Sequence, residues 1–113
     1  MAKAIVMGGC GAVGRNAVKT LVKDSTFHEV IIGDIDLENA EQMAKTLGSG
    51  VSARQFNAAD RQSCIDAIRD CDLVLNCVGP FYSTVKTILG AAIECRVNYV
   101  DVCDDPDVTL EIL

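Results

Sequence analysis

Tryptophan is absent from this sequence, and aromatic residues make up only 4% of its 113 residues. Because 50% of the residues are hydrophobic, the chain can still bury a core, and that core must be aliphatic. Histidine occurs once, as His28, and no Cys-x-x-Cys pair is present. Zinc sites draw on clustered cysteine and histidine ligands, so we expect no metal site and a solvent-facing His28.

Positive charge is also scarce, with 10 lysine and arginine residues against 16 aspartate and glutamate residues and a net charge of −6. No basic run stands out, which argues against nucleic acid and an anionic membrane surface as partners. No apolar run approaches the roughly 20 residues that cross a bilayer, and the start lacks the apolar core of a signal peptide. We therefore expect a cytoplasmic protein. A local anion site remains compatible with this charge, because backbone amides and helix dipoles do not depend on it.

The cysteines are numerous but show no disulfide or metal-binding spacing. Most of the six lie inside apolar runs, where cysteine acts as a small hydrophobic residue. All six are Cys10, Cys64, Cys71, Cys77, Cys95 and Cys103. We expect free thiols in a reducing compartment. Cys103 is a poor candidate for a nucleophile, because no histidine partner is in sight.

A glycine-rich turn is the most informative feature that is present. The apolar run Ala4–Met7 leads into it, and a helix is expected over Val13–Lys23. Gly9, Gly11 and Gly14 match G-x-G-x-x-G, the spacing of a dinucleotide-binding βαβ unit. We expect Gly9 to permit a positive φ, Gly11 to leave space for a pyrophosphate, and Gly14 to bring helix and strand together. The helix N-terminus would offer unpaired N–H groups to the phosphates.

An acidic residue follows at the distance that this motif requires. Asp34 comes directly after the apolar run Val30–Gly33, where a carboxylate accepts hydrogen bonds from the ribose hydroxyls of a bound cofactor. Asp36 precedes a helical pattern, and its short side chain suits an N-cap. We assign the ribose to Asp34 and the cap to Asp36, with a solvated turn residue as the alternative for Asp34.

The same residues bear on the choice of cofactor. A carboxylate would repel a 2′-phosphate, and Ile35 occupies the position where an arginine would favour NADP. The sequence thus favours NAD. NADP is the alternative, since Arg54 or Arg61 can intervene from elsewhere in the fold.

The rest of the chain alternates strand-like and helical segments, which predicts an α/β fold. The expected strands are Ala4–Met7, Glu29–Gly33, Val51–Phe56, Asp72–Val78 and Tyr99–Cys103. Four helices are expected after the first one: from the Asp36 cap to Gly48, over Arg61–Arg69 with Asp60 as cap, from a Ser83 or Thr84 cap to Cys95, and from Asp107 onward. Right-handed crossovers predict a three-layer, doubly wound parallel sheet of the Rossmann type, in strand order 3-2-1-4-5. A complete two-halved domain has more strands, so we expect residues 1–113 to be a truncated NAD(P)-binding domain, the N-terminal fragment of a longer dehydrogenase. Its last strand would be covered by further residues or by another chain, such as a second copy.

Three stretches carry a family resemblance: V-M-G-G-C-G-A-V-G at 6–14, D-L-V-L-N-C-V-G-P-F-Y at 72–82 and V-N-Y-V-D-V-C-D-D at 97–105. Together they resemble the N-terminal NAD(P)-binding domain of the saccharopine dehydrogenase family. The resemblance implies hydride transfer between NAD(P) and a C–N bond of an amino-acid-like substrate, which a following domain would bind. The implied cofactor contacts are Gly9, Cys10, Gly11, Ala12, Val13 and Gly14 at the pyrophosphate, Asp34 and Ile35 at the ribose, Asn57 and Ala58 at the adenine, and Val78, Gly79 and Pro80 near the nicotinamide ribose. Asn57 has a plain turn role as its alternative.

No catalytic residue is assigned. Asp101, Asp104 and Asp105 follow the last expected strand, where an acid can donate a proton or cap a helix. Tyr82 and Lys86 have the Tyr-x-x-x-Lys spacing of short-chain reductases but start a helix instead of standing where that chemistry needs them. A regulatory, nucleotide-sensing domain without catalysis is the alternative function.

Overall fold

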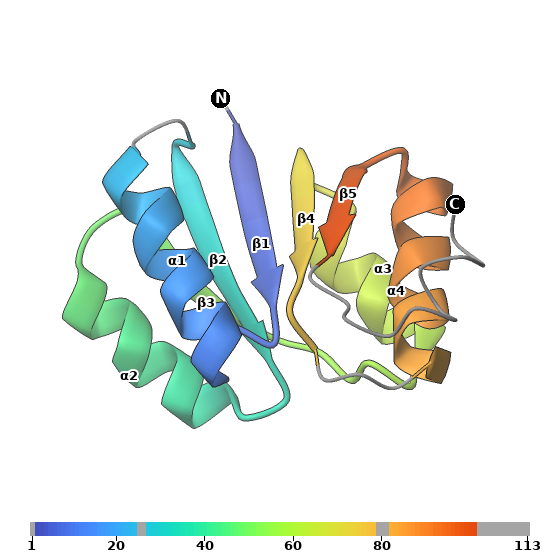
Figure 1. Cartoon of the computed structure of the whole chain (residues 1–113), viewed down its shortest axis with the longest axis horizontal. Helices are drawn as coiled ribbons and strands as arrows, with labels where there is room; N and C mark the ends of the chain where they lie inside the picture. The colour runs from blue at the N-terminus through green and yellow to red at the C-terminus, as the bar shows by residue number, and fades with distance from the viewer. Residues whose placement is uncertain (1, 25–26, 79–81, 102–113) are drawn as a thin grey trace.

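The computed structural model describes residues 2–24, 27–78 and 82–101. In this part of the chain, five parallel strands form one sheet in the order β3-β2-β1-β4-β5 (Figure 1). The elements are β1 (Lys3–Met7), α1 (Ala12–Asp24), β2 (Glu29–Asp34), α2 (Leu37–Leu47), β3 (Val51–Gln55), α3 (Arg61–Ile68), β4 (Leu73–Asn76), α4 (Tyr82–Cys95) and β5 (Asn98–Asp101). The predicted Rossmann-like α/β fold and its strand order are confirmed. None of these helices has the length and apolar character needed to cross a membrane.

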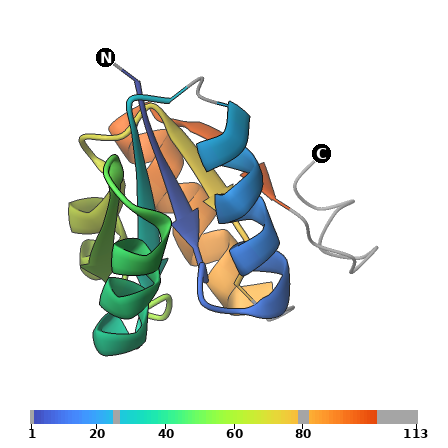
Figure 2. The same ribbon diagram turned by 90° about the vertical axis from the view of Figure 1, so that its left-hand side faces the viewer.

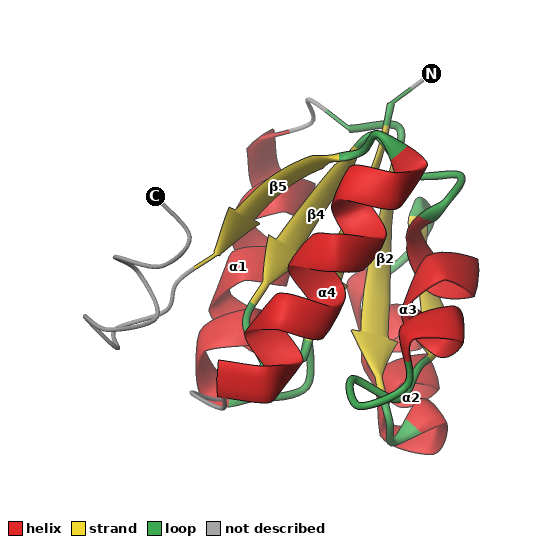
Figure 3. Ribbon diagram, turned by 90° about the vertical axis from the view of Figure 1, so that its right-hand side faces the viewer, coloured by secondary structure: helices red, strands yellow, loops and turns green. Residues whose placement is uncertain are grey.

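Helices cover both faces of the sheet, because successive residues of the buried strands point to opposite sides. Ile5 and Ile31 pack with the helices α3 and α4 on one face. Val6 and Ile32 pack with α1 and α2 on the other. Figure 2 brings α1 and α2 to the front, with α4 behind the sheet, and Figure 3 shows α1 and α4 on opposite sides of β4 and β5. The largest fully buried side chains of the described residues are aliphatic or contain sulfur, as the composition predicted.

Both predicted aspartate caps are confirmed. The Oδ1 atom of Asp36 accepts a hydrogen bond from the Asn39 N–H at 3.1 Å at the start of α2. The Oδ1 atom of Asp60 accepts from the N–H groups of Gln62 and Ser63 at 3.0 and 3.3 Å at the start of α3. Each carboxylate satisfies N–H groups that have no acceptor inside the helix.

Several element boundaries differ from those predicted. Helix α4 already begins at Tyr82, so Ser83 and Thr84 lie within its first turn and the prediction that one of them caps the helix is wrong. Strand β4 ends at Asn76, two residues early, because the N–H of Val78 donates to the Asn76 side chain at 3.0 Å instead of extending the sheet. The predicted end of the last strand, Cys103, and the whole helix predicted from Asp107 fall outside the described residues.

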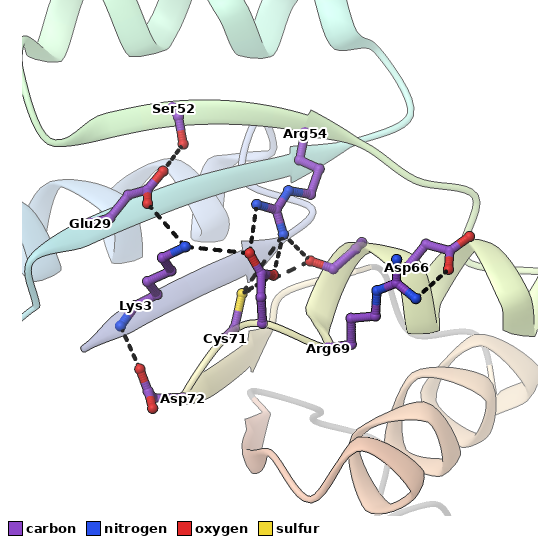
Figure 4. A network of polar contacts seen from close by, with 10 residues as sticks. Lys3, Glu29, Ser52, Arg54, Asp66, Arg69, Cys71 and Asp72 are labelled. Atoms are coloured by element: carbon purple, nitrogen blue, oxygen red, sulfur yellow. Dashed lines mark hydrogen bonds and ion pairs between the residues drawn. The ribbon is translucent and has the colours of Figure 1, made fainter. Parts of the chain in front are cut away.

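The amino end of the sheet is held by a network of charged side chains (Figure 4). The Asp70 carboxylate accepts hydrogen bonds from Arg54 Nη1 at 2.8 Å and from Lys3 Nζ at 3.4 Å. The Arg54 guanidinium also donates to the Ala67 carbonyl at 2.6 Å, near the C-terminus of α3. These bonds lower the pKa of Asp70 to about 2, with the Arg54 hydrogen bond as the main cause. Charge at this end of the sheet is thus used to join β1, β3 and α3.

Candidate functional site

A groove of about 370 Å³ lies at the opposite, carboxyl end of the sheet. It is formed by the segments that follow β1, β2, β3 and β4, as expected for an open parallel sheet. Its lining consists of Gly8, Gly11, Asp34, Ile35, Phe56, Asn57, Ala58, Ala59, Cys77 and Val78. Six of these residues were predicted as cofactor contacts: Gly11, Asp34, Ile35, Asn57, Ala58 and Val78.

The turn after β1 corrects one glycine assignment. Gly8, with φ of +80°, adopts the left-handed backbone that was expected at Gly9. A Cβ at Gly8 would also lie 3.0 Å from the Cys77 backbone. Gly9 is needed for space, because its Cβ would come within 2.7 Å of Ile32 Cγ2. The chain leaves the strand one residue early since both N–H groups, of Gly8 and Gly9, donate to the Gly33 carbonyl at 2.7 and 3.1 Å.

The other two motif glycines differ in their surroundings. A Cβ at Gly14 would lie 2.8 Å from the Gly9 Cα, so α1 packs directly on the turn. A Cβ at Gly11 would meet only the Gly8 carbonyl oxygen, at an ordinary 3.5 Å, and would otherwise project into open space. Ala12 and Val13 stand in the first turn of α1, where N–H groups have no acceptor within the helix. The turn therefore presents backbone donors beside an unfilled space.

Asp34 connects the end of β2 to this turn. Its Oδ2 atom accepts a hydrogen bond from the Cys10 N–H at 3.1 Å, and its Oδ1 atom accepts from the Asp36 N–H at 3.1 Å. Ile35 is 64% exposed beside it. Asp34 is thus a partly buried, oriented carboxylate at the rim of the groove.

Cys10 is in an environment that disfavours its thiolate. Burial is the main cause, and the negative charge of Asp34 adds to it, so that the pKa of the Cys10 thiol rises to about 11. On the outer side, Arg15 Nη2 donates to the Cys10 carbonyl at 3.3 Å. Cys10 is therefore held by the Asp34 carboxylate at its N–H and by the Arg15 guanidinium at its carbonyl.

The turn after β3 gives Asn57 a structural task. Its N–H donates to Ser63 Oγ at 2.8 Å, and its Oδ1 atom accepts from the Ala59 N–H at 3.0 Å. The amide oxygen thus shapes the turn, and the Nδ2 donor is the part of the side chain that remains for another partner. Phe56, just before it, is only 4% exposed and closes the floor of the groove.

Four lining residues were not predicted: Gly8, Phe56, Ala59 and Cys77. The Gly-Gly doublet was a signal for Gly8, and Phe56 and Cys77 follow strands whose carboxyl ends meet at this edge. Predicted contacts Gly79 and Pro80 lie outside the described residues.

The two arginines considered for the cofactor do not line the groove. Arg54 pairs with Asp70, and Arg61 Nη2 lies 3.6 Å from the Glu94 carboxylate. Cys103, Asp104 and Asp105 fall outside the described residues. Within the described ranges, no group of three or more histidine, cysteine, aspartate or glutamate side chains is arranged to hold a metal ion. The five cysteines described there are free thiols.

Solved structures share this fold across most of the chain. Apo saccharopine dehydrogenase (L-Glu forming) from Saccharomyces cerevisiae matches with a TM-score of 0.81 and 20% identity, over 99% of this chain and 24% of that one. A wide-type short-chain dehydrogenase/reductase from Veillonella parvula in complex with NADP matches with a TM-score of 0.74 and 12% identity, over 88% and 46% of the two chains. Serine dehydrogenase from Escherichia coli matches with a TM-score of 0.66 and 12% identity, over 88% and 60%.

The chain is therefore much shorter than these structures, and at such identities the likeness establishes the fold alone. The family description "Saccharopine dehydrogenase NADP binding domain" matches residues 5–110, nearly the whole sequence. That span includes the glycine turn, Asp34 and the segment after β4. The chain belongs to the saccharopine dehydrogenase family, through its NADP-binding domain.

Proposed function

We propose that this chain holds the dinucleotide of a dehydrogenase that transfers hydride between NAD(P) and a C–N bond of an amino-acid-like substrate. The observation that carries the proposal is the open space at Gly11, beside the first turn of α1. Gly11 follows Cys10 directly, and the Cys10 N–H donates to Asp34 Oδ2 at 3.1 Å. A pyrophosphate fits there because backbone N–H groups and the helix dipole both favour an anion. When bound, the nicotinamide supplies the hydride acceptor or donor.

Individual residues take parts that follow from their positions. The backbone from Gly9 to Gly14, Cys10 included, would bind the pyrophosphate. The Cys10 N–H also joins this turn to Asp34 at the end of β2. Asp34 would accept hydrogen bonds from the adenosine ribose, and Ile35 would cover its outer side. Asn57 and Ala58 would flank the adenine, with Asn57 Nδ2 as the donor. Val78, with Gly79 and Pro80 after it, would border the nicotinamide ribose.

NAD is the cofactor that we propose, although the family is described by NADP. The Asp34 carboxylate would lie against a 2′-phosphate and repel it. Arg54 and Arg61, the two cations considered as compensation, form ion pairs with Asp70 and Glu94 instead. Arg15 is the cation closest to the turn along the sequence, and its guanidinium donates to the Cys10 carbonyl.

The substrate would be bound by a further domain. The three solved structures named above are longer proteins: this chain covers only 24% to 60% of their length. We place residues 1–113 as the cofactor domain of a longer, cytoplasmic dehydrogenase.

The test is a single valine at Gly11. Its Cβ would project into the space proposed for the pyrophosphate and contact the protein only at the Gly8 carbonyl oxygen, at an ordinary 3.5 Å. Gly11→Val should therefore lower NADH affinity by at least about tenfold while the fold is kept. Binding is measured by NADH fluorescence and the fold by circular dichroism. Gly90→Val is the matched control, because a Cβ at Gly90 in α4 meets nothing nearer than 3.9 Å. Equal NADH binding by both variants would reject the proposal.

A further inference from the structure

Among the side chains that the structure describes, which leave out those of residues 24, 82–85 and 101, Asn76 is the one buried polar group, with 2% of its surface exposed. Burying an amide costs free energy unless its donors and acceptors are satisfied, and an apolar side chain would fill the same volume without that cost. Asn76 is the last residue of β4, at the carboxyl edge where the groove opens. A buried amide at this position calls for an explanation beyond packing.

Both ends of the Asn76 amide are used, and they join different parts of the site. Nδ2 donates to the hydroxyl of Tyr99 on β5 at 2.9 Å. Oδ1 accepts from the N–H of Val78 at 3.0 Å. Val74 and Tyr99 are opposite each other in the sheet, so the tyrosine reaches along the face to the end of β4. One side chain thereby links the edge strand β5 to the segment that leaves β4.

That segment forms a wall of the groove. The Cys77 N–H donates to the Met7 carbonyl at 2.8 Å, which holds it beside β1. Its backbone also lies 3.0 Å from the position of a Cβ at Gly8. Val78 follows, lining the same groove as Gly11 and Asp34. The backbone at Cys77 and Val78 is therefore held by Asn76 on one side and by β1 and the glycine turn on the other.

We infer that Asn76 is a positioning residue that, with Tyr99, sets the wall at Val78 for the nicotinamide half of the cofactor and leaves the adenosine half unaffected. The inference rests on the proposed function. The two halves are separable because Asp34, Asn57 and the glycine turn are held by bonds that do not involve Asn76. Loss of the amide should free the Val78 backbone without disturbing the adenosine side.

A matched pair of variants isolates the bond to Val78. In Asn76→Thr the threonine hydroxyl can still accept a hydrogen bond from the Val78 N–H, two residues ahead. In Asn76→Val the side chain has the shape of threonine but no atom that can accept this bond. Dissociation constants are measured by calorimetry for NADH, or for NADPH if it binds the unaltered chain more tightly, and for ADP, the portion that both cofactors share. Asn76→Val should weaken dinucleotide binding roughly tenfold and ADP binding less than about twofold, and Asn76→Thr should recover much of the loss.

Tyr99→Phe provides a second variant, which removes the Asn76–Tyr99 hydrogen bond and keeps the bond from Val78 to Asn76. It should shift the ratio of the two affinities in the same direction by a smaller factor, even if Asn76→Val fails to fold. Equal weakening of dinucleotide and ADP in these variants, or no change in either, would overturn the positioning role while leaving the proposed function in place. If the unaltered chain binds neither ADP nor a dinucleotide, the proposed function itself fails.

Discussion

The carboxylate of Asp34 accepts a hydrogen bond from the backbone N–H of Cys10 at 3.1 Å, which ties the end of β2 to the glycine turn after β1. Its second oxygen is held by the Asp36 N–H, also at 3.1 Å. Both oxygens are therefore oriented by backbone N–H groups of the chain itself. Such preorganisation reduces the cost of ordering the site when a ligand binds.

Removing the charge of Asp34 should change cofactor preference. Asp34→Asn keeps an oxygen for the Cys10 N–H but loses the ionised acceptor for ribose and the repulsion of a 2′-phosphate. NADH affinity should fall roughly tenfold, and the ratio of NADPH to NADH affinity should rise by more than that factor. Fluorescence titration with each cofactor measures both. Asp36→Asn is the control, since this neighbouring carboxylate caps α2; the same ratio in both variants would contradict the role of Asp34.

The thiol of Cys10 should be unreactive at neutral pH. Its pKa of about 11 lies well above the ordinary value, so the thiolate fraction at pH 8 is small. Alkylation by iodoacetamide should be slower than for a free cysteine by a factor on the order of 100. Asp34→Asn should speed the reaction, because it removes one cause of the raised pKa, although burial remains. Peptide mass spectrometry follows the modification of Cys10, and a rate equal to that of free cysteine would show that the thiol is not shielded.

Local patterns were sufficient for much of the fold. Asp36 and Asp60 were predictable as caps because a short acceptor before a helical pattern acts on N–H groups within three residues. The strand order followed from alternation of strands and helices with right-handed crossovers. Asp34 was found by its spacing from the glycines. Its bond to Cys10 was not, since that contact depends on how two strands are paired.

The features that sequence reasoning missed depend on contacts between distant segments. Gly8 takes the positive φ in place of Gly9, because hydrogen bonds to the Gly33 carbonyl decide where the chain leaves the strand. The pairing of Arg54 with Asp70 removes a cation that was considered for the cofactor, and no periodicity announces such a pair. Asn76 lay within a quoted motif, yet its role as a link to β5 appears only once the strands are side by side.

The motif glycines should differ in what an alanine does to stability. A Cβ at Gly14 would lie 2.8 Å from the Gly9 Cα, and backbone on both sides leaves little room to adjust. Gly14→Ala should therefore lower the free energy of unfolding by about 2 kcal/mol or more. Gly11→Ala, whose Cβ has only a 3.5 Å contact, should change it by less than about 0.5 kcal/mol. Urea denaturation measures both, and equal losses would show that the turn is packed differently.

The Asp70 network predicts a specific dependence of stability on pH. The Arg54 hydrogen bond holds the pKa of Asp70 at about 2, below the 3.8 of an unperturbed aspartate. A carboxyl with a lowered pKa in the folded state contributes stability that is complete above about pH 4 and is lost as the pH falls towards 2. Because the Asp70 side chain is 45% exposed, screening reduces this contribution to about 1 kcal/mol.

Asp70→Asn should thus be less stable than the unaltered chain at pH 7 and nearly equal to it at pH 2, as measured by urea denaturation at each pH. The exposed Asp66→Asn, whose ion pair with Arg69 spans 3.9 Å, is the control and should give a much smaller difference at pH 7. A stability gap for Asp70→Asn that is the same at both pH values would mean that its loss of packing, and not its charge, accounts for the effect.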